Sequence, residues 1–144
     1  MLSTLKLTSK LSRRQAVQEQ AITDFSAAAA HYLDTIVGDV EIANLLSGRG
    51  YGTARLAEGC RLQQRLQTAI AHRQTLIDVA GDARCLVASD QATVKPIVVK
   101  ATANRNAAYD DLKAYMKNLK SSAILALRPR PDLLKKLDDG STGW

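Results

Sequence analysis

A long regular pattern of apolar positions lies in the middle of the chain. Apolar or small residues recur in alternating steps of three and four, at Leu62, Leu66, Ala69, Leu76, Ala80, Ala83 and Val87. This spacing is the period of a helix with one buried stripe. We expect a long helix that starts at Thr53, a residue type suited to an N-cap. Arg73 fills one inward position, and we expect it to reach solvent or to pair with an acid such as Asp24 or Asp34 on another helix.

A second long pattern predicts another helix, starting at Pro96. Its inward positions are Ile97, Ala101, Asn104, Ala108, Leu112, Tyr115, Leu119, Ser122 and Ala126. Proline is tolerated in the first turn of a helix and disfavours helix at the residue before it. The turn between the two long helices therefore lies between Gly81 and Pro96, and we place it at residues 89–95. Pro129 and Pro131 end the second helix.

Three further helices complete the prediction. A first long helix, capped by Ser9 or Ser12 and ending at Gly38, has an inward stripe of Ile22, Phe25, Ala29, Tyr32 or Leu33, and Ile36. Its four alanines, residues 27–30, allow another helix to approach closely. A short helix opens at Asp39, with Ile42, Leu45 and Leu46 as its apolar face, and a last one spans residues 132–137. Residues 1–10 read as an N-terminal arm and residues 138–144 as a flexible tail.

Composition agrees with a helical fold. Hydrophobic residues make up 46% of the 144 residues but aromatic residues only 4%, and much of the apolar content is alanine and leucine. Strands favour β-branched and aromatic residues, whereas this mixture suits closely packed helices. We therefore predict a single all-α domain over residues 1–144, an elongated antiparallel helical bundle of three long helices and two short ones.

The net charge of +6 is unevenly placed. Residues 95–136 carry ten basic side chains against three acidic ones. Lys113, Lys117 and Lys120 are spaced to form one stripe on the third long helix, and further basic residues could lie nearby: Lys100, Arg128 and Arg130. A surface that follows nucleic-acid phosphates would have this form, and so would an ordinary solvated helix face. These six residues are the candidate nucleic-acid contacts.

A glycine-rich elbow precedes the central helix. Amide groups at a helix start, with arginines beside them, could bind an anion, which makes a candidate site of Arg49, Gly50, Gly52 and Arg55. The specific nucleotide-binding loops have a lysine and a hydroxyl residue after the glycines and a strand before them. Here both are lacking, so the pattern favours a sharp turn between two helices over a phosphate cradle.

The titratable residues do not form a recognisable catalytic or metal-binding motif. The only histidines are His31 and His72, and the only glutamates are Glu19, Glu41 and Glu58, with no Glu-x-x-His pair among them. No Gly-x-Ser-x-Gly nucleophile motif occurs either. We therefore predict no enzymatic activity, no catalytic residue, no metal and no cofactor.

The chain gives little sign of export or membrane insertion. Cys60 and Cys85 form no CxxC motif, which suits a reducing compartment, and no run of eighteen apolar residues exists to span a membrane. The first eighteen residues are basic, rich in hydroxyl groups and free of acids, which loosely resembles an organelle transit peptide. We expect an ordinary N-terminal arm and a cytoplasmic protein.

One segment resembles a known group of proteins. Gly50, Tyr51, Arg55, Leu56, Glu58 and Gly59 form a Gly-Tyr-x-x-x-Arg-Leu-x-Glu-Gly segment. It resembles a segment of uncharacterised bacterial helical proteins in which a long helix rich in alanine and glutamine follows. The resemblance covers about a third of the chain and implies an all-helical bundle in a bacterial cytoplasm, without implying an activity.

These observations lead to two functional hypotheses. The first is a non-enzymatic interaction or scaffolding protein that self-associates or binds another protein, because long helices with alanine-lined faces in a small chain need not all be covered internally. The alternative is a protein that binds nucleic acid or another polyanion through the basic third helix and the C-terminal corner.

Overall fold

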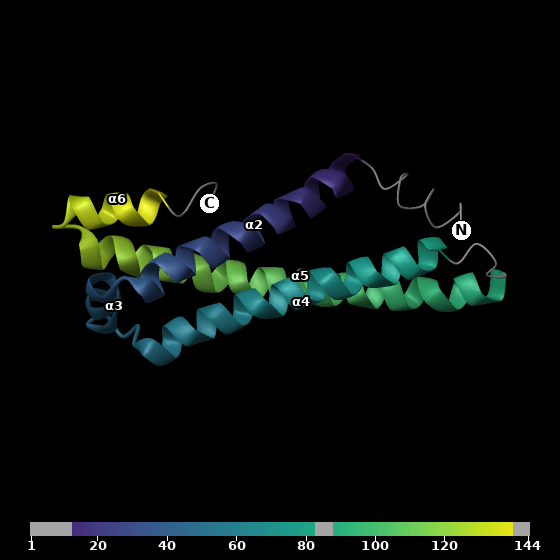
Figure 1. Cartoon of the computed structure of the whole chain (residues 1–144), viewed down its shortest axis with the longest axis horizontal. Coiled ribbons are helices and arrows are strands. Elements are labelled where there is room, and N and C mark those ends of the chain that lie inside the picture. Colours follow the sequence, from purple (N-terminus) through teal and green to yellow (C-terminus); the bar gives the residue numbers. More distant parts are fainter. Residues whose placement is uncertain (1–12, 83–87, 140–144) are drawn as a thin grey trace.

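The described part of the protein, residues 13–82 and 88–139 of a computed structural model, is built of helices (Figure 1). In chain order they are α2 (Arg13–Gly38), α3 (Val40–Ser47), α4 (Thr53–Asp82), α5 (Ala88–Leu127) and α6 (Pro131–Asp139). The predicted all-α bundle of three long and two short helices is confirmed. The expected arm at residues 1–10 lies outside the described residues.

The two longest helices set the direction of the molecule. α4 and α5 run antiparallel side by side and make the most extensive helix pairing of the fold. α2 packs on them near the end where α3 lies, and its N-terminal part rises away from the pair in Figure 1. α6 contacts α2 and α5 at that same end. The result is an elongated bundle whose helices gather at one end.

The hydrophobic core lies at the end where the helices gather. Large side chains that are almost completely buried come from four of the helices, α2 to α5: Tyr32, Leu33, Ile36, Ile42, Leu46, Leu66, Leu112, Met116, Leu119 and Leu127. Leu133 and Leu137 of α6 are 3% exposed and join the same cluster. Each such side chain contributes about 1.5–3 kcal/mol to stability on burial, so this end holds most of the apolar stabilisation.

Asp39 begins α3 and ties it to α6. Its carboxylate accepts hydrogen bonds from the amides of Glu41 and Ile42, both at 3.1 Å, which is the N-cap arrangement expected from the sequence. It also accepts from Lys136 Nζ at 2.9 Å. The hydrogen bond from Lys136, followed by those from the backbone, lowers the pKa of Asp39. This one side chain therefore links the start of α3 to α6.

The elbow between α3 and α4 is a Schellman motif. The amide of Gly50 donates to the Ser47 carbonyl at 3.0 Å, and the amide of Tyr51 donates to the Leu46 carbonyl at 2.9 Å. Gly50 has φ of +88°, the left-handed conformation that this motif requires. Gly52 has no positive φ, and its carbonyl accepts the first bonds of α4, so Gly52 takes the capping position that we assigned to Thr53. The buried Tyr51 then closes the elbow against the core.

α4 and α5 approach each other closely at Gly59. A Cβ atom added there would lie 2.7 Å from Cζ and 2.8 Å from Oη of Tyr115. The Tyr115 hydroxyl donates a hydrogen bond to the Arg55 carbonyl at 2.6 Å. The glycine therefore makes room for an aromatic ring that bridges the two helices.

The predicted position of the turn between the long helices is wrong. α5 begins at Ala88, so residues 89–95 are helical and Pro96 lies inside the helix. An internal proline removes the hydrogen bond to the carbonyl four residues earlier. That carbonyl belongs to Ala92, and both Ala92 and Pro96 are exposed, so water can satisfy the group. Continuous helix is therefore compatible with the proline.

The buried face of α5 also differs from the predicted one. Ile97 and Asn104 are exposed, and Tyr115 is only half-buried, whereas Arg105, Met116, Ala123 and Leu127 are buried. A strict seven-residue repeat drifts around a straight helix by about 20° per repeat. Over 40 residues the inward face therefore moves by one position.

The last helix is longer than predicted. Asp138 and Asp139 belong to α6, so the segment that we assigned to a tail from residue 138 begins inside a helix. Residues 140–144 lie outside the described part.

Gly50→Ala is expected to destabilise the fold by about 1–2 kcal/mol, the cost of placing an L-residue in a left-handed conformation. No heavy atom lies within 4 Å of the Cβ position, so the loss is conformational rather than steric. Gly38→Ala is the matched control, because the Cβ position of Gly38 is equally open and its φ is not positive. Urea unfolding followed by circular dichroism measures both, and equal stability of the two variants would contradict the assignment of Gly50.

Asp39→Ala is expected to lower stability at neutral pH by about 1 kcal/mol, the usual value of an N-cap side chain. Asp39→Asn, which retains a capping oxygen, should lose less. Because the folded-state pKa of Asp39 is lowered, the carboxylate stabilises the fold above the unfolded-state pKa near 3.8. This contribution is lost as the pH falls through the folded-state value.

The stability difference between wild type and Asp39→Asn should therefore narrow below pH 3.8. Urea unfolding across acidic pH measures it, with the exposed Asp110→Asn as control. A difference that stays constant with pH would contradict a charge contribution.

Candidate functional site

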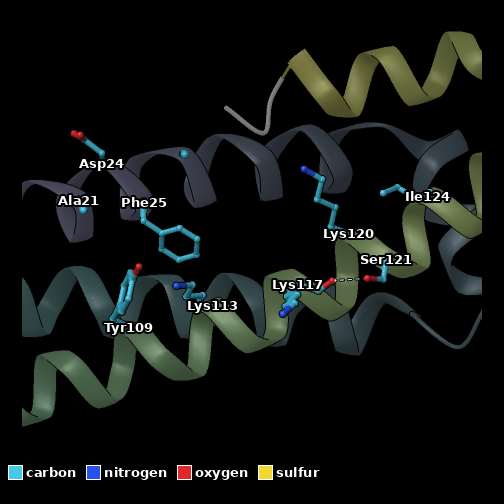
Figure 2. Close-up of a pocket in the computed structure, with 10 residues that line it drawn as sticks. Ala21, Asp24, Phe25, Tyr109, Lys113, Lys117, Lys120, Ser121 and Ile124 are labelled. Carbon is cyan, nitrogen blue, oxygen red and sulfur yellow. Dashed lines mark hydrogen bonds between the residues drawn. The ribbon is translucent and has the colours of Figure 1, made fainter. Parts of the chain in front are cut away.

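A groove with a volume of about 890 Å³ lies between α2 and α5 (Figure 2). We call it the α2–α5 groove. One wall comes from α2 and the other from α5, and together they contribute Ala21, Asp24, Phe25, Ala28, Tyr109, Lys113, Lys117, Lys120, Ser121 and Ile124. The groove exists because α2 presents the small residues Ala21 and Ala28 where α5 presents long side chains.

An aromatic pair lines one part of the groove. Phe25 and Tyr109 meet edge to face, with ring centroids 5.2 Å apart and an angle of 79° between the planes. The ammonium group of Lys113 lies 5.5 Å from the centroid of the Tyr109 ring, within cation–π range. This part of the groove therefore offers an apolar surface next to a positive charge.

Lysines form the wall that α5 contributes. Lys113, Lys117 and Lys120 lie along one side of the helix, and Figure 2 shows them at the groove. The only acidic residue in the lining is Asp24, which accepts a hydrogen bond from Gln20 Nε2 at 2.9 Å. Three positive charges against one negative charge make the groove basic, and its apolar residues distinguish it from a plain solvated helix face.

The other predicted basic contacts lie elsewhere. Lys100 is exposed on the part of α5 far from the groove, and Arg128 is exposed at the corner before α6. Arg130 forms an ion pair with Glu41 at 2.5 Å, which connects the start of α6 to α3. Of the six candidates, the structure therefore brings three together and gives one a role in holding the bundle end.

Most backbone amides of the elbow form hydrogen bonds within the turn. The amides of Arg49, Gly50 and Tyr51 all donate to carbonyl groups of α3, and those of Arg55 and Leu56 donate to the Gly52 carbonyl. The Arg55 guanidinium lies 5.1 Å from the ring centroid of Tyr51. These amides are already used by the turn itself, which favours the structural interpretation of the glycines.

A charged cluster that was not predicted from the sequence lies where α2, α4 and α5 meet. Glu19 Oε1 lies 2.6 Å from Arg73 Nη1 and 3.3 Å from Arg105 Nη1. The side chains of Arg73 and Arg105 are only 7% and 6% exposed, and that of Glu19 is 32% exposed. Arg73 pairs across helices as expected, but with Glu19 instead of Asp24 or Asp34. We call these three residues the Glu19 cluster.

Neighbouring polar groups complete the Glu19 cluster. Arg73 Nε donates to Thr102 Oγ1 at 2.6 Å, and Arg105 donates to the side chain of Asn106. Burial, and then the charge of Arg73, lower the pKa of Arg105. A signal for this cluster exists in the sequence, because Glu19 and Arg105 continue the inward spacing of Ile22 and Ala108. Charges at inward positions need partners.

The residues that could perform chemistry lie apart. His31 and His72 are exposed on different helices, and burial raises the pKa of the Cys60 thiol, which disfavours the reactive thiolate. Within residues 13–82 and 88–139, no group of three His, Cys, Asp or Glu side chains is placed to hold a metal ion. None of the helices in that same part combines the length and apolar character needed to cross a bilayer.

No protein-family model, curated protein or solved structure matches this chain. The resemblance carried by residues 50–59 therefore stays a prediction.

Glu19→Gln is expected to lower the free energy of unfolding by about 3 kcal/mol, because it leaves two buried guanidinium groups without a carboxylate. Glu58→Gln is the matched control: Glu58 pairs with Arg61 on the exposed face of α4, where such pairs contribute about 0–1 kcal/mol. Urea unfolding measures both variants. Combining Glu19→Gln with Arg73→Met and Arg105→Met should recover most of the loss, and equal small losses for Glu19→Gln and Glu58→Gln would disprove the role of the cluster.

Proposed function

We propose that this protein is a non-enzymatic helical interaction protein that self-associates through the end of the α4–α5 pair remote from the core. This segment, residues 74–82 and 88–104, lies beyond the Glu19 cluster, and we call it the hairpin arm. Within it the N-terminal part of α2 no longer lies against the pair (Figure 1). Among the described residues, the arm therefore consists of two helices, whereas the core end consists of five.

Burial in the hairpin arm is the observation that carries this proposal. Among its described side chains, at positions 74–79 and 92–104, only Ala101 is buried. Val79 is 62% exposed, Val99 60% and Ile97 48%. Leu76, Ile77, Val94 and Val98 are half-buried. In the described part, the arm thus lacks any fully buried large apolar side chain.

Helix packing gives a physical reason for the arms to pair. Two helices alone can bury one narrow stripe each, which leaves apolar side chains on the flanks in water. Two arms packed together would form a four-helix arrangement and bury those flanks, which is the usual way that long helices gain stability. Alanines along the arm, such as Ala92 and Ala103, would let the helices approach closely.

The same proposal includes a cytoplasmic location. Cys60 is a free thiol, which suits a reducing compartment. The wide separation of the histidines and the raised pKa of the Cys60 thiol give no support to an enzymatic role.

Polyanion binding is the second candidate function, favoured by one specific observation. Lys113, Lys117 and Lys120 share one wall of the α2–α5 groove, so a chain of negative charges could follow them. With Arg130 engaged by Glu41, and Lys100 and Arg128 placed elsewhere, this basic track is short.

Replacing Ile97 and Val99 by glutamate is expected to convert self-associated protein to monomer, because paired arms would have to bury the new charges. Sedimentation velocity at about 100 μM, a concentration at which even a weak interface is occupied, measures the mass. The matched control is the pair Val17→Glu and Val40→Glu, which alters valines of similar exposure outside the arm. A monomeric wild type at that concentration, or equal dissociation by both pairs, would overturn self-association through the arm.

A further inference from the structure

The α2–α5 groove lies in line with α6, further along the surface that α2 and α5 form. α6 lies on α2 and α5 at the core end and buries Leu133 and Leu137 there. Burial, and then the nearby Asp138, raise the pKa of Tyr32, which places the last turn of α6 beside residue 32 of α2. Ala28, one turn further along α2, already lines the groove. The fourth helical position of the bundle is thus filled by α6 at one end, and no other helix of residues 13–82 and 88–139 occupies it beyond α6.

The lining specifies what could fill that open position. Phe25, Ala28 and Ile124 present apolar surface, and Ile124 is 42% exposed, although large apolar side chains gain stability by leaving water. The lysines at 113, 117 and 120 span about 10 Å along α5 at 1.5 Å per residue. Carboxylates spaced three and four residues apart on a second helix have the same repeat.

We propose that the α2–α5 groove binds an acidic amphipathic helix of a partner protein. The apolar face of that helix lies on Phe25, Ala28 and Ile124, and its carboxylates pair with the three lysines of α5. This is the helix-in-groove mode of recognition, in which apolar anchors at helical spacing supply the affinity. The proposal extends the role of an interaction protein to a second surface and does not depend on pairing of the hairpin arms.

An acidic helix fits the groove better than a nucleic acid does. Phosphate backbones gain affinity from cations but little from an alanine and isoleucine lining. Binders of single strands typically stack bases on open aromatic faces. Here the Phe25 side chain is 8% exposed, and its ring packs edge to face with that of Tyr109. The Lys113 ammonium group lies over the Tyr109 ring. The aromatic pair therefore has no open ring face on which a base could stack, although Phe25 still forms part of the apolar lining.

Fluorescence anisotropy of labelled peptides, with the full chain as receptor, tests the proposal. The probes are amphipathic peptides of about four helical turns, with leucine or phenylalanine on one face and glutamate on the other. The same peptides with lysine in place of glutamate serve as the probe control. We expect saturable binding of acidic peptides only, weakened about tenfold by the double variant Lys113→Glu and Lys117→Glu.

Two further variants separate groove binding from simple charge attraction. Ser121→Trp fills the groove from an exposed position without changing its charge, and should weaken binding by a similar factor. The control pair Lys100→Glu and Lys135→Glu changes the net charge equally but lies outside the groove lining, and should leave affinity within about twofold. Circular dichroism confirms that each variant keeps its helical content.

Several results would overturn the proposal. One is failure of every acidic peptide to bind at low salt. Another is that the double variant Lys113→Glu and Lys117→Glu loses binding while Ser121→Trp binds as well as wild type, which would indicate attraction to surface charge alone. Equal or tighter binding of single-stranded DNA, with the same sensitivity to Lys113→Glu and Lys117→Glu, would assign the groove to nucleic acid instead. Dissociation of paired arms by Ile97→Glu and Val99→Glu should leave peptide binding unchanged, which keeps this test separate from that of self-association.

Discussion

The Glu19 carboxylate determines how far along their length the three long helices stay in contact. It is shared by two buried guanidinium groups that arrive from α4 and α5. Buried charges are tolerated only with well-placed partners, so a separation of α2 from the pair at this level would expose or strand Arg73 and Arg105. An ion cluster of this kind is a weak source of net stability but a strong source of specificity, because few other helix arrangements satisfy it.

The Glu19 cluster also divides the molecule into two regions with different physical character. On the side of α3 and α6, large apolar side chains from every described helix are buried together. On the other side, the described side chains of the hairpin arm are exposed or half-buried, apart from Ala101. The α2–α5 groove belongs to the first region but shares a property with the second, namely helix surface that no other described helix covers. Both proposed contact surfaces are of this type.

Much of the fold could be predicted from local chemistry. The start of a helix at Asp39, the sharp turn at the elbow glycines and the helical periods depend on residues close in sequence, and the sequence predicted each of them. The start of α5 was misplaced because the preference of Pro96 for a helix start is weak where the lost hydrogen bond faces water. The face of α5 was misassigned because the drift of a seven-residue repeat accumulates along a long helix.

The candidate site was less predictable because it depends on relations between distant helices. The lysine stripe was visible, but the apolar surface beside it comes from α2. The hollow also depends on where α6 ends, which no local pattern indicates. Likewise, Glu19 and Arg105 both lie on the inward spacing of their own helices, but their pairing depends on the level at which α2 and α5 meet.

The contact between Gly59 and Tyr115 has a consequence for the far end of the molecule. Sliding α5 along α4 by one turn would bring the ring of Tyr115 against Arg55 or Gln63, whose side chains leave no notch of the kind that glycine provides. The contact therefore fixes the position of α5 along the axis of α4. That position is fixed about 30 Å from Val79, at 1.5 Å per residue along α4. Which faces of the two helices stand opposite each other in the arm is thus decided near the elbow, where the chain first enters α4.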